Sequence, residues 1–543
     1  MRLDLITAQS SFALCYGFDT ANAAFNLSVV YRKARTTQQE LSRVGEDCRP
    51  PWMLRPGRKS RLLKRSAGQG NNPNSPPPWR NRLNFKRFLF SFFLFSLCAA
   101  AGAAAQSASS PQYLSFAEAQ PLLRAMTADL PADLRGPSPL TAHRWANWVH
   151  QEDAEIRARL ERGEEDTLIN LLRFGITFTK EYRIDDQYLF KYGQSTLVNA
   201  FAENRANDLV RAMASGSANE GVAHLRAFLE KKGYSFATLQ ERARVKSYLL
   251  ANLARMRDEI RRYISQTQAG ERFQLFQDRG ISLDTNLWPD FLIDQHLANM
   301  VRKGLLRPGS VRRVAVVGPG LDFANKETGN DFYPRQTIQP FAVLDSLIRL
   351  DLSSPASVEL YTLDISSEVN FHIARARKNA AAGRAYVVQL PWNTAARMTD
   401  EYRQSFTGYW ETLGSSIGEP VPAIAVPAAA AETLSRALKI RPEIVLRITP
   451  LDTNIVVEHP ALAPQGGFDL IIGTNVFVYF GEFEQALARL NMALMLNPGG
   501  CALSNDRLPG LASDGLSDSL ETTQIFARNP DRTEYMFTYE RRK

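Results

Sequence analysis

One short segment limits the fold of this chain more than any other: a β-branched run at residues 311–317 that leads directly into Gly318-Pro319-Gly320. The run is rich in valine, as are strands of parallel sheets that are buried on both faces. Glycines after a first strand let the backbone approach a nucleotide closely, and a following helix offers free N–H groups. The segment therefore predicts the first strand and turn of a doubly wound α/β sheet. Phe323 stands where dinucleotide-binding proteins carry a third glycine, which disfavours NAD or FAD.

A second strand is predicted at residues 358–363, and it ends in Asp364. An acidic residue at the tip of the second strand is placed to accept hydrogen bonds from both ribose hydroxyls of an adenosine ligand. Asp364 could also cap the helix that begins near Ser366, and the two roles are compatible. Because Gly320 and Asp364 are about twice as far apart as the usual ~20 residues, we expect residues 322–339 to form an inserted loop over the pocket.

Two more strands complete the predicted sheet. Residues 468–480 form a buried strand whose polar residues begin toward its carboxyl end, and a helix follows at 482–495. Residues 496–504 then contain a Pro-Gly-Gly turn into another strand. Ligands of open α/β sheets lie outside the carboxyl ends of the strands. The glycine turn, Asp364 and Asn475 all fall at those ends.

Together these four elements resemble the class I S-adenosylmethionine-dependent methyltransferases from about residue 312 to the C-terminus. Residues 468–504 are the most specific part. There the sequence is similar to the CheR-type glutamate methyltransferases, which carry an asparagine, an apolar run and Tyr-Phe, as residues 475–480 do. The resemblance implies an α/β fold with a Rossmann-like, mostly parallel sheet and a C-terminal antiparallel hairpin. The all-helical domain expected before it rests on the sequence pattern alone. It also implies S-adenosylmethionine as the cofactor.

The resemblance further assigns roles to single residues. The glycine turn would hold the methionine part of the cofactor, and Asp364 would bind the ribose. Asn454, together with Asp452 and Leu451, would contact the adenine. Asn475 would mark the site of methyl transfer. The cofactor-binding residues implied in this way are Gly318, Pro319, Gly320, Asp364, Ile365, Asp452, Asn454 and Asn475.

Methyl transfer from a sulfonium is an in-line displacement, so the protein's main tasks are to position the acceptor and to exclude water. A base is needed only if the acceptor must lose a proton. Receptor glutamates are not predicted as the acceptor, because Thr474 stands where the CheR-type proteins usually carry arginine and their glycine-loop signature is absent. The candidate catalytic residues are Asn475, Tyr479, Asp322 and Tyr333, with Asp331 as a further candidate base.

Apolar side chains at three- and four-residue steps predict an all-helical domain at residues 106–303, punctuated by Gly163 and Gly175. The methyltransferase-like domain is predicted at 304–543, with an insertion at about 390–438. The aromatic side chains of the insertion could form a lid or substrate wall, or a small core of their own. The six histidines are dispersed, and we expect no metal site.

The first 105 residues hold 16 Lys and Arg against 5 Asp and Glu, whereas the remainder holds 49 against 51. The net charge of +9 therefore belongs to the leader, and no nucleic-acid partner is expected. Residues 1–84 predict a disordered or non-native leader, and 85–105 a signal peptide cleaved after Ala105 or a membrane anchor. A genuine leader makes the body exported or anchored, with membrane contact only through residues 88–105. A gene-start artefact makes it cytoplasmic.

Three functions stay open at this point. The chain could be an active methyltransferase whose acceptor is a protein or a small molecule. It could be an exported or anchored protein that keeps the methyltransferase fold as a binding module, because S-adenosylmethionine is a cytosolic metabolite. It could also be an NAD(P)-dependent oxidoreductase. The enzymatic hypotheses require the glycine turn and Asp364 to border one crevice.

Overall fold

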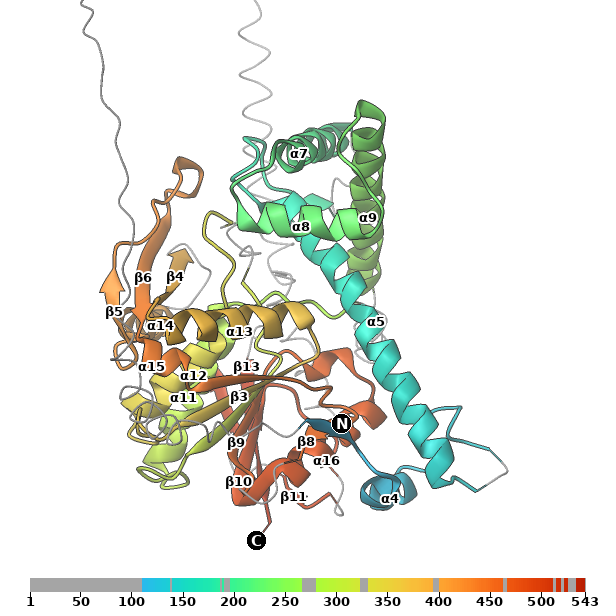
Figure 1. Cartoon of the computed structure of the whole chain (residues 1–543), viewed down its shortest axis with the longest axis vertical. Helices are drawn as coiled ribbons and strands as arrows, with labels where there is room; N and C mark the ends of the chain where they lie inside the picture. The colour runs from blue at the N-terminus through green and yellow to red at the C-terminus, as the bar shows by residue number, and fades with distance from the viewer. Residues whose placement is uncertain are drawn as a thin grey trace, which may run out of the picture. The chain divides into compact units, whose positions relative to one another are not determined.

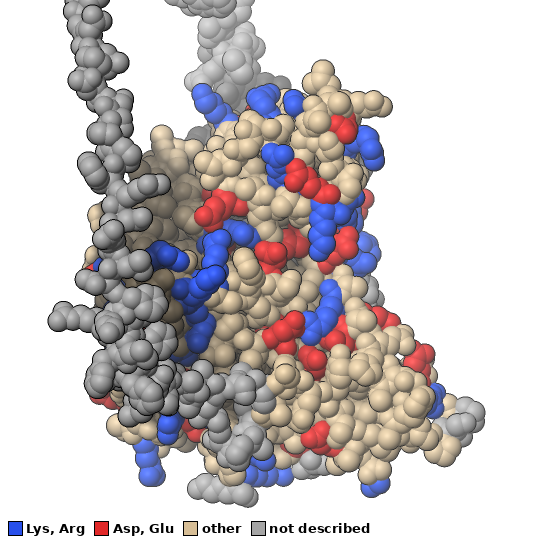
Figure 2. All heavy atoms as spheres, in the orientation of Figure 1, with Lys and Arg blue, Asp and Glu red and all other residues tan. Residues whose placement is uncertain are grey.

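The computed structural model describes residues 110–136, 139–185, 188–189, 196–265, 280–322, 331–393, 400–461, 466–510, 514–518, 522–525 and 534–542. The leader and the signal or anchor segment predicted for residues 1–105 lie outside these residues. No helix in the described ranges combines the length and the apolar character that crossing a bilayer requires. Acidic and basic side chains are interspersed over the helical bundle on the face that Figure 2 shows.

The centre of the fold is a twisted sheet with the strand order β11-β13-β10-β9-β2-β3-β7, in which β12 also pairs with β13 (Figure 1). Strands β2, β3, β7, β9 and β10 run parallel, and β13 runs antiparallel to β10. This arrangement confirms the predicted mostly parallel sheet with an antiparallel C-terminal hairpin. The strands of this sheet are β2 (Arg313–Val317), β3 (Glu359–Asp364), β7 (Ile448–Asp452), β9 (Phe468–Gly473), β10 (Leu496–Ser504), β11 (Leu516–Ser517), β12 (Thr522–Ile525) and β13 (Glu534–Arg541).

The register of the parallel strands brings their carboxyl ends level. Val317 in β2 lies opposite Leu363 in β3 and opposite Gly473 in β9. The next residues of these strands therefore meet at one edge of the sheet, as expected for a doubly wound fold. On the far side of β3, Asp364 lies opposite Asp452 in β7.

One predicted strand is too long. Strand β9 ends at Gly473 instead of Phe480, and Phe477–Tyr479 form the 3₁₀ turn η2. Phe477 and Val478 are apolar because they are buried in this turn, so their apolar character does not indicate a strand. The predicted bounds of the next helix are confirmed, as α16 spans Glu482–Met495. Strand β10 spans Leu496–Ser504 and so includes the residues predicted as a turn.

Helices cover both faces of the sheet, and each face has its own hydrophobic core. One core joins alternate residues of β2 to α11, α12, α13, α14 and α15. The other joins the intervening residues of β2 to α4, α16 and the first half of α5. These helices are α4 (Phe116–Ala125), α5 (Ala142–Phe174), α11 (Leu287–Arg302), α12 (Gln339–Arg349), α13 (Ser367–Ala381), α14 (Asp400–Thr412), α15 (Pro442–Val445) and α16 (Glu482–Met495).

A third core lies in a separate helical bundle. It contains the second half of α5 together with α7 (Thr196–Ser215), α8 (Glu220–Lys231) and α9 (Leu239–Ser265). The predicted helical character of this region is confirmed, but the hydrophobic cores do not divide at residues 303 and 304. Helix α5 belongs to two cores, and β1 (Pro111–Tyr113) pairs with β8 (Glu458–Pro460) near the end of the chain. All the described residues accordingly fall in one compact unit.

The predicted insertion begins and ends slightly outside its expected bounds. It contains β4 (Tyr386–Asn393), α14, β5 (Gly418–Val421), the 3₁₀ turn η1 (Ala428–Ala430) and β6 (Thr433–Ile440), and its strands form a sheet of order β4-β6-β5. Phe406, Tyr409 and Trp410 are buried in the core that covers one face of the main sheet. The Trp288 ring of α11 stacks on Tyr402 of α14 at a centroid distance of 5.4 Å. The aromatic side chains therefore anchor the insertion to the main body.

Glycine 163 does not interrupt the helix, contrary to its predicted role, whereas Gly175 is the C-cap of α5. The segment that starts at Gly280 crosses α5 at Gly163, and the Ile281 N–H donates to the Arg159 carbonyl at 3.2 Å. A β-carbon on Gly163 would lie 1.8 Å from the Ile281 carbonyl oxygen. Gly163 is thus required by the close approach of another backbone segment.

We predict that Gly163→Ala destabilises the protein, because the crossing backbone would have to move away from α5. The loss should exceed about 1 kcal/mol in the free energy of unfolding, as for overpacked cores. Gly408→Ala is the matched control, since Gly408 also lies inside a helix but a β-carbon there would have no neighbouring atom within 4 Å. The control should gain up to about 1 kcal/mol from helix propensity. Denaturant unfolding of both variants checks this, and equal stabilities would contradict it.

Candidate functional site

A pocket opens at the carboxyl ends of β2, β3 and β9, where the register of the sheet brings the predicted residues together. It encloses about 850 Å³ of empty space, part of which is open to solvent. Its walls also include Leu160 of α5 and the crossing segment at residues 281–285. The predicted site residues that line it are Gly318, Gly320, Asp364, Ile365, Asn454, Asn475 and Tyr479.

The glycine turn borders one side of the pocket. Gly318 and Gly320 have φ angles of 60° and 66°, which L side chains rarely adopt. A β-carbon on Gly320 would lie 2.5 Å from the Leu283 carbonyl oxygen, and that oxygen accepts a hydrogen bond from the Leu321 N–H at 2.8 Å. Pro319 is buried between the two glycines and does not line the pocket. Glycine at position 320 therefore lets the crossing segment lie against the turn.

Asp364 borders the pocket beside the turn. Its Oδ1 accepts a hydrogen bond from the Ser366 N–H at 2.8 Å, and the Gly320 N–H lies close enough to the carboxylate to lower its pKa. Ser366, not Asp364, is the N-cap of α13. Burial raises the pKa of Asp364 to about 7, against the two backbone N–H groups, which lower it. The glycine turn and the carboxyl group predicted to bind ribose thus lie side by side.

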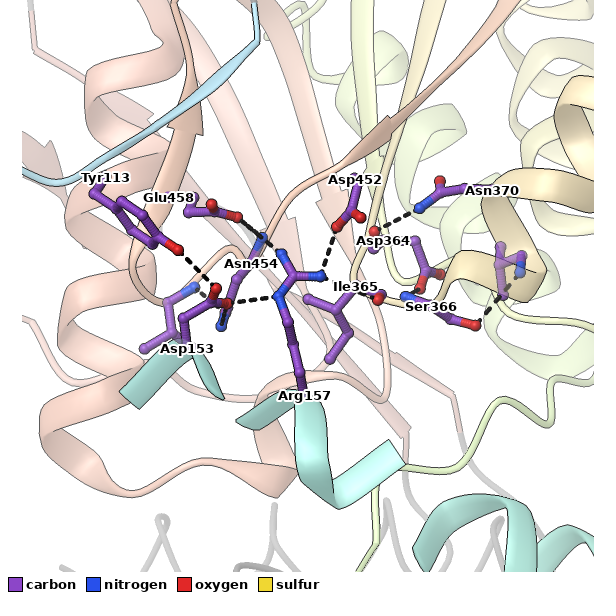
Figure 3. Close-up of polar contacts among 12 residues, drawn as sticks. Tyr113, Asp153, Arg157, Asp364, Ile365, Ser366, Asn370, Asp452, Asn454 and Glu458 are labelled. Atoms are coloured by element: carbon purple, nitrogen blue, oxygen red, sulfur yellow. Dashed lines mark hydrogen bonds and ion pairs between the residues drawn. The ribbon is translucent and has the colours of Figure 1, made fainter. Parts of the chain in front are cut away.

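Asp452, a predicted adenine contact, lies outside the pocket lining. Its side chain is 59% exposed and accepts a hydrogen bond from Arg157 Nη1 at 2.6 Å (Figure 3). At the end of β7, the Asp452 side chain points toward α5. The sequence did not predict that α5 lies at this position. Leu451, proposed with it, is buried in the core and does not line the pocket either.

Asn454 does line the pocket, but its side chain already has partners. Its Nδ2 donates to Asp153 Oδ1 at 2.9 Å, and its Oδ1 accepts from the Val456 N–H at 3.2 Å. Thr453, which the sequence analysis did not single out, also lines the pocket, and its buried hydroxyl oxygen has no hydrogen-bond partner. Thr453 is therefore the residue of this loop with unused hydrogen-bonding capacity.

Asn475 is held in a strained conformation at the end of β9. It has a φ of 58°, a left-handed value that asparagine tolerates better than most residues. Asn505, just after β10, accepts a hydrogen bond from the Asn475 N–H at 2.8 Å and donates from Nδ2 to Asn475 Oδ1 at 2.7 Å. This reciprocal pair stabilises the strained turn at the pocket wall. Only the Asn475 side of it was predicted, because Asn505 has no motif of its own.

The remaining catalytic candidates fall in two places. Tyr479 lines the pocket, and its carbonyl oxygen accepts a hydrogen bond from Arg159 at 2.8 Å. Asp322 and Tyr333 are buried outside the pocket lining, where the Tyr333 hydroxyl donates to Asp322 Oδ1 at 2.8 Å. The Asp331 carboxylate accepts hydrogen bonds from the Ile176 N–H and the Thr177 hydroxyl, so it joins the end of α5 to this region. These three residues have structural partners and are not brought to the pocket.

Thr474 and Asp290 were not predicted as site residues. Thr474 lines the pocket, and its hydroxyl accepts a hydrogen bond from Gln339 Nε2 at 2.9 Å. Asp290, in the first turn of α11, is buried. Burial raises its pKa to about 8, with the Gln339 amide acting in the opposite direction and the charge of Asp322 adding to the rise. In the described ranges, no group of three or more His, Cys, Asp or Glu side chains is placed to hold a metal ion.

The strand order, the parallel register and the glycine turn beside an acidic second-strand residue decide the fold of this part of the chain. It is a class I methyltransferase fold. No protein-family model matches the sequence, and no curated protein matches it either.

Solved structures with some similarity include three methyltransferases. The N-methyltransferase NodS from Bradyrhizobium japonicum WM9, in complex with S-adenosylhomocysteine, is 14% identical, with coverage of 47% of this chain and 88% of NodS and a TM-score of 0.23. Magnesium protoporphyrin IX methyltransferase from Synechocystis PCC 6803, with bound S-adenosylmethionine, is 11% identical over 52% of this chain and 90% of that chain, with a TM-score of 0.22. The glycopeptide N-methyltransferase MtfA, complexed with S-adenosylmethionine, is 12% identical over 47% of this chain and 67% of that chain, with a TM-score of 0.19.

We predict that Asp290→Asn makes the protein's stability less dependent on pH. A pKa raised from about 3.9 in the unfolded chain to about 8 in the folded chain means that the folded state keeps a proton which the unfolded state loses. The contribution to stability is therefore full below about pH 4 and is lost as the pH rises toward 8. Relative to wild type, the variant should gain more than about 1 kcal/mol between pH 5 and pH 8.

Thermal melts at these two pH values measure the effect. The control is Asp129→Asn, because Asp129 is exposed. Parallel pH profiles for wild type and Asp290→Asn would show that the buried carboxyl does not titrate in this range.

Proposed function

We propose that this chain binds S-adenosylmethionine in the pocket at the edge of the sheet and transfers its methyl group to an acceptor. One observation supports the proposal most strongly. The glycine turn and Asp364 border one open pocket at the carboxyl ends of the first two strands, where the Gly318 N–H donates to the Leu363 carbonyl at 2.9 Å. Nucleotide-like ligands of doubly wound sheets bind at this point.

The residues of the pocket suit the parts of this cofactor. The Asp364 carboxylate would accept hydrogen bonds from the ribose hydroxyls, as second-strand acids do. Ile365 and Ile455 supply apolar surface for the adenine ring, and Thr453 supplies a hydroxyl with no other partner. The glycine turn would face the methionine portion.

The cofactor supplies a methyl group that is activated by a positively charged sulfur. The protein's part is to hold the acceptor in line with that group and to exclude water. Leu160, Val317 and Leu363 contribute apolar walls for this purpose. Asn475, Thr474 and Tyr479 form the polar side of the pocket next to β9 and would contact the acceptor. The Tyr479 hydroxyl is the candidate to take part in proton transfer, if the acceptor carries a proton that must leave.

We infer that the acceptor is a protein or a small molecule. The remainder of the chain after the leader is close to neutral, with 49 basic against 51 acidic residues, so it lacks the excess of positive charge that nucleic-acid binding requires. Isothermal titration with S-adenosylmethionine and, separately, with NADH tests the cofactor. Binding of the first alone supports the proposal. Binding of neither supports a binding module without turnover, and binding of NADH supports an oxidoreductase.

We predict that Asp364→Ala weakens the binding of S-adenosylmethionine by at least about tenfold, since hydrogen bonds to a charged group contribute about 1.5–3 kcal/mol. Asp364→Asn should lose less, because an amide oxygen can still accept one bond. Asp345→Asn is the control: Asp345 is also buried, but it bonds to Ser416 and does not line the pocket. Calorimetric dissociation constants measure these effects. An unchanged affinity in Asp364→Ala would refute the ribose role.

We also predict that cofactor affinity falls at acid pH. The ionised form of Asp364 accepts two ribose hydrogen bonds, so binding below its pKa of about 7 requires the loss of a proton. The affinity should therefore be highest above about pH 7 and decrease by up to about tenfold for each pH unit below it. Calorimetry from about pH 5.5 to 8.5 measures this. The pH dependence should disappear in Asp364→Asn.

A further inference from the structure

Arg157, near the middle of α5, is the centre of a group of charged side chains beside the pocket (Figure 3). Its guanidinium donates to Asp153 Oδ1 at 2.8 Å, to Asp452 Oδ1 at 2.6 Å and to Glu458 Oε2 at 3.2 Å. A further hydrogen bond of 3.3 Å runs from Nη1 to the carbonyl oxygen of Ile365. One side chain of the helical region therefore contacts β7, β8 and the residue that follows the second-strand acid.

The arrangement has more negative than positive charge. Asp153, Asp452 and Glu458 surround the guanidinium, and Asp364 lies next to Asp452 across the β3–β7 pair. Asp452 raises the pKa of Asp364 and Arg157 lowers it, although burial has the largest effect. Loss of the Arg157 charge would leave these carboxylates to repel one another in a partly buried place.

The same helix also contacts the other end of the pocket. Arg159 donates to the Tyr479 carbonyl, and Leu160 lines the pocket directly. The Arg159 carbonyl in turn accepts a bond from Ile281, the first residue of the crossing segment that lines the pocket. This part of α5 thus holds both the β3 side and the β9 side of the site.

We propose that Arg157 is a positioning residue for cofactor binding: it fixes the Ile365 backbone and the Asp452 carboxylate at the wall of the pocket and places its positive charge beside Asp364. This inference rests on the proposed function, because it concerns the same pocket. It assigns Asp452 to the attachment of α5 and leaves the adenine to Thr453 and the apolar residues. The helical region then contributes to the cofactor site through Arg157 as well as through Arg159 and Leu160.

The test measures the dissociation constant of S-adenosylmethionine by calorimetry across pH for the full chain and its variants. Arg157→Gln should weaken binding at pH 7 by at least about tenfold. It should also move the pH midpoint of binding upward, because Asp364 loses a nearby cation while Asp153, Asp452 and Glu458 remain. Arg157→Lys should keep the midpoint but bind less tightly, because an ammonium group cannot make the four-partner contact of the planar guanidinium.

A charge rescue makes the test more specific. In the Arg157→Gln background, Asp452→Asn removes one of the repelling carboxylates, so the double variant should bind more tightly than Arg157→Gln alone. Arg255→Gln is the matched control. Arg255 bridges Asp166 and Glu259 in the helical bundle at 2.6 and 2.8 Å, so its loss should lower the melting temperature without changing cofactor affinity.

The outcomes separate the two proposals. If the wild-type chain binds no S-adenosylmethionine, the proposed function fails and the role of Arg157 fails with it. If wild type binds and Arg157→Gln shows the same affinity and pH midpoint, only the role of Arg157 is overturned. If Arg157→Gln does not fold, Arg157→Lys decides, since an unchanged affinity in that variant contradicts the positioning role.

Discussion

The site depends on the burial of the Asp364 carboxyl group between two turns. A carboxyl taken out of water needs hydrogen-bond donors; the Ser366 N–H donates to it, and the Gly320 N–H nearby lowers its pKa. These N–H groups come from the turns after β2 and β3, so the two turns must lie side by side. The Gly318 N–H bonds to the Leu363 carbonyl at 2.9 Å and extends the same pairing. The pocket therefore exists because two adjacent strands end at one level and share a carboxylate.

Much of this arrangement could be predicted from the sequence, because its signals are local. A valine-rich run followed by Gly-Pro-Gly, and an apolar strand that ends in an acid, each carry a recognisable pattern over a few residues. Parallel pairing then brings their carboxyl ends together without further information. The helix at Glu482–Met495 had the clearest pattern, and its predicted bounds agree with the structure. By contrast, the end of β9 depends on a left-handed Asn475 whose partner Asn505 lies 30 residues away.

The features that the sequence did not predict depend on contacts between distant parts of the chain. Asp452 lies at the correct strand end, but its partner Arg157 is 295 residues away and sits on a helix whose direction no local pattern specifies. The role of Gly163 also depends on a distant segment. A glycine inside a helical pattern predicts a break, unless another backbone segment approaches it. Ile281 makes that approach. The buried acid Asp290 was missed because a single aspartate in an amphipathic helix does not reveal which neighbours surround it.

Helix α5 joins the helical bundle to the sheet, because it belongs to a hydrophobic core of each. It has 33 residues, and so a length of about 50 Å at 1.5 Å per residue. Its first half is buried with the sheet and its second half with α7, α8 and α9. A continuous helix resists bending, so its two halves keep a fixed relation to each other. Arg157, Arg159 and Leu160 lie between the two halves, at the pocket. The helical bundle and the wall of the pocket therefore share one element, α5. A displacement of the bundle that moves α5 would also move the side chains that hold Ile365 and Tyr479.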